Sequence, residues 1–97
     1  MKNEEAKQED VFIVEYERST PGMMDTHSIY GAYKNNYMAY GSMYHHFYYT
    51  LTSMKENTFN FNSLYDIEIL SDSMAIRSKE KPMSDYVILR VKRETLQ

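Results

Sequence analysis

The sequence predicts one small α+β domain: an antiparallel sheet of about four strands with one helix packed on one face. Three observations support this fold class. The chain has 97 residues, which is the length of a single domain with one core. Stretches near both ends alternate between apolar and polar residues, as strands do, and a central stretch repeats large side chains every three or four residues, as helices do. Hydrophobic residues make up 42% of the chain, which allows a packed core and argues against a wholly disordered chain. The polar residues 1–9 are predicted to be a disordered tail, and residues 10–97 are predicted to form the domain.

Two strands are predicted before the helix. The first covers residues 10–18, and both of its faces begin with apolar residues, so we expect it to lie inside the sheet. Pro21 and Gly22 then form a turn. The second strand covers residues 27–33, where Gly31 allows a β-bulge or a close approach of another backbone.

The helix is predicted over residues 36–53. Asn35 or Asn36 is expected to cap it, because a short side-chain oxygen can accept a hydrogen bond from a first-turn amide. Spacings of three and four residues place most of its large side chains along one stripe. The members of this stripe are Tyr37, Tyr40, Tyr44, Phe47, Tyr48 and Leu51. Met38 and Met43 are expected to lie off the stripe, so the helix is apolar or aromatic around much of its girth.

A polar connection is predicted over residues 55–63, followed by a strand over residues 64–70. This strand alternates cleanly, and we expect its apolar residues to point inward. They are Tyr65, Ile67 and Ile69. Asp66 and Glu68 are expected to face solvent.

Residues 71–84 are expected to form a loop that contains at most a short extended piece at residues 74–76. The last strand is predicted over residues 85–93, with Val87, Leu89 and Val91 facing inward. The predicted order of elements is therefore ββαββ.

Several kinds of chemistry are not supported by the sequence. There is no cysteine, so disulfides and thiolate zinc sites are excluded. His45 and His46 are adjacent on the predicted helix and point about 100° apart, so they cannot share one metal ion. No serine has a nucleophile-elbow pattern around it, and no glycine-rich loop could hold a phosphate. We therefore expect a protein without enzymatic activity, with no catalytic residues, no metal site and no cofactor.

The expected location is the cytoplasm. The first ten residues lack the apolar stretch of a secretory signal, and no apolar run approaches the roughly 20 residues that span a bilayer. No membrane partner is expected.

The central part of the chain has the composition of a protein-binding surface. Residues 19–63 carry only four formal charges but hold seven of the ten tyrosines and five of the eight methionines. This composition is typical of interface cores, although a buried helix has it too. A helix on a sheet cannot bury all of these phenol rings, so we expect some of them to be exposed and to bind a partner. The predicted partner-binding residues are Tyr37, Tyr40, Tyr44, Tyr48, Met23 and Met24.

Nucleic-acid binding is the alternative hypothesis. Residues 77–97 hold six Lys and Arg against three Asp and Glu, and Arg90, Lys92 and Arg93 end the last strand. With exposed tyrosines nearby, they could form a basic groove with a stacking platform. The sequence pI of about 5.5 argues against it, because nucleic-acid-binding domains usually have a strongly basic surface. A homo-oligomer that buries its tyrosines within itself is a third alternative.

Two segments carry a resemblance to a known type of protein. They are VFIVEYER at residues 11–18 and, after the Pro-Gly loop, IYGAYKNNYMAYGSMYHH at residues 29–46. Over residues 11–47 the chain resembles small phage-encoded proteins of the host-takeover type from phages of Gram-positive bacteria. The resemblance implies a protein of the host cytoplasm that binds and modulates a host bacterial protein. AAA+ proteases or chaperones of the Clp type, RNA polymerase and other host machines are the candidate partners. The segment between Lys55 and Tyr86 departs from that type, and the resemblance assigns no functional residue.

Overall fold

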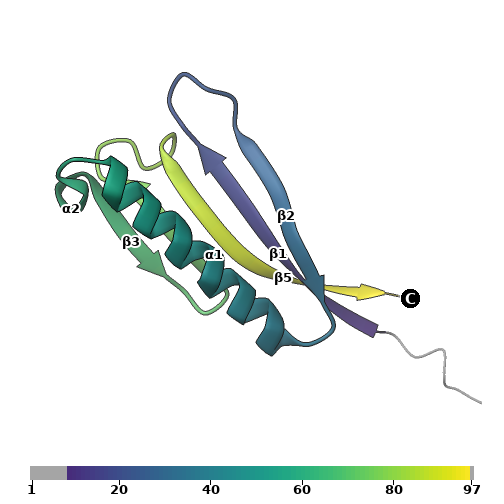
Figure 1. Ribbon diagram of the computed structural model, residues 1–97. Helices are drawn as coiled ribbons and strands as arrows, with labels where there is room; N and C mark the ends of the chain where they lie inside the picture. Colours follow the sequence, from purple (N-terminus) through teal and green to yellow (C-terminus); the bar gives the residue numbers. More distant parts are fainter. Residues whose placement is uncertain (1–8, 97) are drawn as a thin grey trace, which may run out of the picture.

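A computed structural model describes residues 9–96 as an α+β domain with a five-stranded sheet (Figure 1). The strands are β1 (Glu9–Ser19), β2 (Thr26–Tyr33), β3 (Tyr65–Ile69), β4 (Ser73–Ser78) and β5 (Tyr86–Leu96), and the helices are α1 (Asn36–Asn57) and α2 (Phe61–Leu64). Strand order across the sheet is β2-β1-β5-β4-β3, and each neighbouring pair is antiparallel. Residues 1–8, most of the predicted tail, lie outside the described residues, whereas Glu9 belongs to β1.

The α+β class is confirmed, but the prediction of about four strands is wrong by one. The segment predicted as a loop at residues 71–84 contains β4, which pairs with β3 on one side and with β5 on the other. The expected extended piece at residues 74–76 is the centre of this strand. Helix α1 continues to Asn57, and the predicted polar connection contains the end of α1 and the short helix α2.

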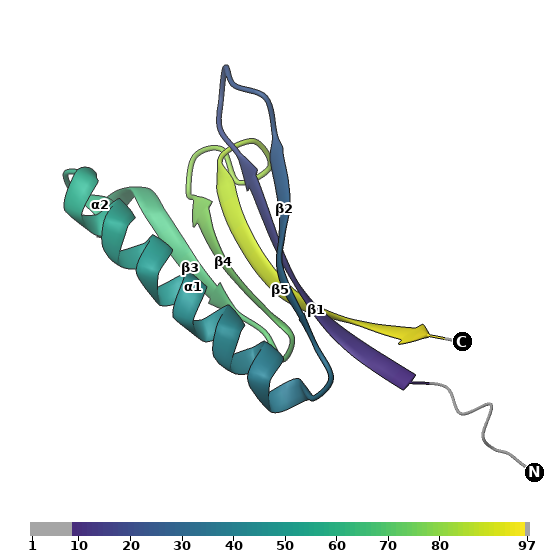
Figure 2. The same ribbon diagram turned by 45° about the vertical axis from the view of Figure 1, so that its right-hand side comes forward.

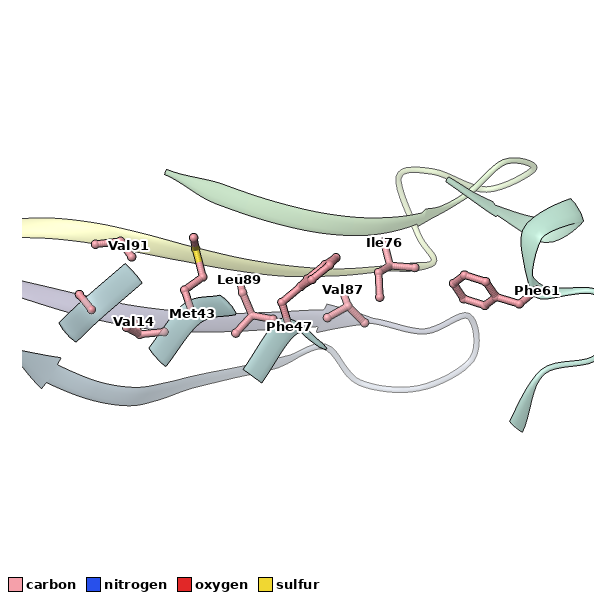
Figure 3. Close-up of a cluster of buried hydrophobic side chains, with 9 residues drawn as sticks. Val14, Met43, Phe47, Phe61, Ile76, Val87, Leu89 and Val91 are labelled. Atoms are coloured by element: carbon pink, nitrogen blue, oxygen red, sulfur yellow. The ribbon is translucent and has the colours of Figure 1, made fainter. Parts of the chain in front are cut away.

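One face of the sheet and one side of α1 form the core (Figure 3). The sheet contributes Val14, Ile76, Val87, Leu89 and Val91, α1 contributes Ala39, Met43 and Phe47, and α2 contributes Phe61. The prediction that alternate residues of the last strand point inward is confirmed. Burial of each large aliphatic or aromatic side chain contributes roughly 1.5–3 kcal/mol to folding.

Two local features place α1 on the sheet. At its start, the Asn35 side chain accepts a hydrogen bond of 3.0 Å from the Met38 N–H, so the predicted cap is confirmed. In the pairing of β1 with β2, Val14 lies opposite Gly31, but the next residue, Glu15, lies opposite Ile29. Tyr30 of β2 is therefore an unpaired bulge residue next to the glycine. A bulge re-aims a side chain, and here the ring of Tyr30 contacts that of His46 on α1.

The side of α1 that faces the sheet is not centred on the predicted tyrosine stripe. Its buried line is Ala39, Met43 and Phe47, at intervals of four residues. Met43, which was expected off the stripe, is therefore a central core residue. The tyrosines of the stripe lie to one side of this line and reach from the edge of the core to solvent. No helix among residues 9–96 is long and apolar enough to cross a membrane.

Candidate protein-binding surface

Large aromatic side chains cover the exposed side of α1. Tyr37 is 86% exposed, Tyr48 71% and Tyr49 72%, and Tyr44 is also exposed. Among the tyrosines of residues 9–96, only Tyr65 and Tyr86 donate hydrogen bonds from their hydroxyls to other side chains. The rings and hydroxyls on α1 are therefore available to a partner.

The aromatic residues of α1 divide between two flanks of the helix. The ring of His46 contacts that of Tyr30 of β2 with centroids 4.2 Å apart, so the flank that carries His46 and Tyr49 faces β2. Tyr44 and Tyr48 lie on the other flank, where the helical repeat also places Tyr37. This second flank faces β3, because β2 and β3 are the opposite edges of the sheet beneath α1 (Figure 1).

Strand β3 extends the sheet beyond the area that α1 covers. Helix α1 packs mainly on β1, β2, β4 and β5. Ile67 lies directly opposite Ile76 and on the same face of the sheet, yet Ile76 is fully buried and Ile67 is 42% exposed. Ile69 is also exposed. The prediction that Ile67 and Ile69 point inward is thus correct for their face and wrong for their burial, because α1 does not cover this part of β3.

These two features lie side by side on the same side of the sheet. We call them the α1–β3 surface, defined by Tyr37, Tyr44, Tyr48, Ile67 and Ile69. Figure 2 shows α1 and β3 adjacent along their lengths. Sequence reasoning missed the two isoleucines, since an alternating pattern predicts which face a residue is on but not whether another element covers that face.

The structure does not bring the six predicted partner-binding residues together. Tyr40 is half-buried against the core, with its ring centroid 6.5 Å from that of Tyr44. Met23 and Met24 are strongly exposed, but they lie in the β1–β2 connection, beside a shallow hollow that α1 does not line. Both views show this connection projecting away from α1 (Figures 1 and 2). The methionines thus form a separate surface.

The three basic residues of the alternative hypothesis each lie close to a carboxylate. Arg90 lies 3.4 Å from Glu15 and 3.3 Å from Glu17, both on β1. Lys92 lies 3.2 Å from Glu94. Arg93 lies 2.6 Å from Asp10, and its hydrogen bond, with one from Thr95, holds the pKa of the Asp10 carboxyl below its usual value. These cations are balanced locally and do not form a free basic stripe.

A cleft of about 370 Å³ separates α1 from β1 and β2. Tyr16 stacks on Tyr30 with centroids 5.2 Å apart, and the ring of Tyr30 in turn contacts that of His46 at a tilt of 40°. Burial, and to a lesser extent the neighbouring His45, lowers the pKa of His46. Burial also raises the pKa of the Tyr30 hydroxyl. Both groups are therefore favoured in their neutral forms, and the stack has the character of a packing contact.

The His46 stack predicts a pH dependence of stability. The neutral imidazole is favoured in the folded state, so its contribution is present above the ordinary histidine pKa and is lost as pH falls through the lowered value. We expect the free energy of unfolding to decrease as pH falls from about 7 to 5, and part of this decrease to vanish in His46→Phe. Urea unfolding at several pH values measures both curves. Parallel curves for the two proteins would show that His46 carries no such linkage.

The other histidines have ordinary surface surroundings. His27 lies 3.9 Å from Glu15 on the sheet face opposite α1. His45 is exposed, and its ring forms a T-shaped pair with that of His46. Over the part of the chain that the structure describes, no three His, Cys, Asp or Glu side chains gather in a way that could hold a metal ion.

The chain was compared with protein-family models, curated proteins and solved structures. No protein-family model, no curated protein and no solved structure matches this chain.

Proposed function

We propose that this chain is a small non-enzymatic protein that binds another protein through the α1–β3 surface and thereby modulates its partner. One observation carries the proposal: Tyr37, Tyr44 and Tyr48 lie exposed along one flank of α1, beside the uncovered Ile67 and Ile69. Exposed apolar residues that gather on one side of a small domain are typical of interaction sites.

The residue types suit this role. A tyrosine side chain offers a large rigid ring with only two rotatable bonds, so it loses little conformational entropy when a partner orders it. Its hydroxyl can still form a hydrogen bond at the rim of an interface. Tyrosine is also among the residues enriched at positions where truncation weakens binding most. Of the four tyrosines predicted as partner-binding, three fit this description, and Tyr40 supports the others from its half-buried position.

We propose that the partner is a host bacterial protein. This step rests on the resemblance to phage proteins of the host-takeover type, whose targets include Clp-type AAA+ machines and RNA polymerase. The exposed tyrosines support a protein partner in general and do not select among these targets. Nucleic acid is the weaker candidate, because Arg90, Lys92 and Arg93 each lie beside a carboxylate.

The test compares two variants with the natural chain as bait. Tagged protein is incubated with nuclease-treated bacterial lysate, and captured proteins are quantified by mass spectrometry. Tyr37→Ala with Tyr48→Ala should reduce recovery of the partner about tenfold or more, since interface anchors often cost 2 kcal/mol or more each. Tyr49→Ala is the matched control, because Tyr49 is as exposed as Tyr48 but lies on the flank that faces β2.

Three results would contradict the proposal. The natural chain could capture no stoichiometric protein. The double variant and Tyr49→Ala could lose the partner equally, which would exclude the α1–β3 surface as the site. Finally, circular dichroism could show that the double variant is unfolded, in which case the two tyrosines stabilise the fold rather than bind.

A further inference from the structure

The two edges of the sheet differ in their ability to accept another strand. The edge strand β2 is interrupted by the bulge at Tyr30. The other edge strand, β3, pairs with β4 in one continuous register from Tyr65 to Ile69. Bulges and prolines protect a sheet edge from further pairing, whereas a regular edge strand presents a row of unpaired backbone groups. Strand β3 contains neither a bulge nor a proline.

The hydrogen bonds at both ends of β3 show which of its backbone groups are free. The Leu70 N–H donates to the Ser73 carbonyl, and the Lys79 N–H donates to the Leu64 carbonyl, each at 2.9 Å. In an antiparallel pair, every second residue bonds to the partner strand. The residues that alternate with Leu64 and Leu70 therefore direct their N–H and C=O groups away from β4, toward the open edge. They are Tyr65, Ile67 and Ile69.

The side chains at this edge carry a different chemistry on each face of the sheet. On the α1 side, Ile67 and Ile69 are apolar and exposed. On the opposite side stand Asp66 and Glu68, whose side chains are 70% and 48% exposed. Lys79 lies 3.8 Å from Asp66, and Arg77 on β4 lies 3.3 Å from Glu68. A strand added beyond β3 would approach both carboxylates from the side away from β4.

This charge pattern disfavours a second copy of the chain as the added strand. Residues directly opposite each other in an antiparallel pair lie on the same face, and like charges in that position are destabilising. If Ile67 pairs with its copy, Asp66 faces the copy's Glu68. If the pairing shifts by two residues either way, Asp66 faces Asp66, or Glu68 faces Glu68. Each of these registers opposes carboxylates.

We infer that β3 accepts a strand from a different protein, in which apolar residues alternate with Lys or Arg. The apolar residues would lie beside Ile67 and Ile69 on the face of the sheet that carries α1, and the basic residues would lie opposite Asp66 and Glu68. Main-chain hydrogen bonds from Ile67 and Ile69 would provide much of the affinity, and alternate side chains the specificity, as in other cases of strand addition. This inference rests on the proposed function and names the segment of the partner that the surface recognises.

Two capped seven-residue peptides test the inference directly. One alternates Val with Lys, and the other alternates Val with Glu. Titration calorimetry with the full chain should give at least about a tenfold preference for the Lys peptide, because two cross-strand charge pairs change sign between the peptides. Asp66→Lys with Glu68→Lys should reverse this preference. Amide hydrogen exchange should slow at Ile67 and Ile69 when the Lys peptide is added.

A proline variant isolates the backbone contribution. Ile67→Pro removes an N–H that faces the open edge and leaves the hydrogen bonds with β4 in place, so binding of the Lys peptide should be lost. Ile67→Ala retains that N–H and should bind with a reduction of only a few-fold. Should the proline variant unfold, the exchange rates of the natural chain decide the matter.

The inference is overturned if neither peptide binds at millimolar concentration, if both bind equally, or if sedimentation shows that the chain dimerises through β3. These outcomes are distinct from failure of the proposed function. Loss of a lysate partner in the Tyr37 and Tyr48 double variant, combined with no peptide binding, would retain the α1 surface and reject the strand. Peptide binding without any tyrosine-dependent partner would do the reverse.

Discussion

Replacing Phe47 with alanine is expected to lower the free energy of unfolding by about 3–5 kcal/mol. Phe47 is 4% exposed and packs between α1 and the sheet, at the end of the buried line formed with Ala39 and Met43. The truncation removes apolar contacts and leaves a cavity that the close-packed neighbours fill only in part. Small domains are stable by only about 5–15 kcal/mol, so this loss is a large fraction of the total. Urea unfolding followed by circular dichroism measures it.

Tyr48→Ala is the matched comparison, because it changes the next residue of the same helix. Tyr48 is 71% exposed, so its removal should change stability by about 1 kcal/mol or less. The pair of variants therefore reports how α1 is rotated on the sheet. Equal losses, or a larger loss at Tyr48, would mean that the tyrosines face the core and that the α1–β3 surface does not exist.

Much of the fold could be predicted from local patterns. The alternating patterns in residues 10–18 and 85–93 predicted β1 and β5. The capping side chain of Asn35 predicted the start of α1. Each of these signals is local, since it depends on neighbouring residues in the chain. Strand β4 gave only a weak local signal, the short extended piece expected at residues 74–76. Its sequence SMAIRS has one large branched apolar residue, Ile76, and it is a strand because β3 and β5 pair with it on both sides.

The candidate site was harder to predict, because tyrosine is ambiguous. A phenol ring suits a core edge and a surface equally well, so spacing alone could not separate Tyr40, which is half-buried, from Tyr37 and Tyr48, which are exposed. The small residue Ala39 is fully buried on the side of α1 that faces the sheet, and it is a weak signal in any hydropathy pattern. Strand β3 is not covered by α1 because it is an edge strand of the sheet. Strand order cannot be predicted from a local sequence pattern.

The sheet face opposite α1 shows why a small domain can leave one face uncovered. Its charges are paired across strands: Arg90 with Glu15 and Glu17, and Arg77 with Glu68. Tyr86 donates a hydrogen bond of 2.9 Å to Glu17, and this bond raises the pKa of its hydroxyl. Antiparallel sheets tolerate water on one face when polar side chains line it. On the α1 side, by contrast, Ile67 and Ile69 of β3 are exposed apolar residues, and the proposed binding surface lies there.

A comparison of two isoleucines that face each other across β3 and β4 tests the basis of that surface. Ile76→Ala should lower the free energy of unfolding by about 2–5 kcal/mol, because Ile76 is fully buried beneath α1. Ile67→Ala changes the same residue type on the same face one strand further out, where the side chain is 42% exposed. Its loss should be about 1 kcal/mol, since roughly half of its surface already contacts water.

The difference between the losses of unfolding free energy in the two variants shows how far α1 covers the sheet. A difference of at least about 1 kcal/mol between the variants is expected, and chemical denaturation of small proteins resolves it when their m-values agree. Similar losses at Ile76 and Ile67 would mean that β3 is covered in solution as well as β4. The exposed isoleucines would then be core residues, and neither the partner nor the added strand could contact them. A small loss at both positions would instead show that the core does not extend to β4, which would contradict the five-stranded sheet itself.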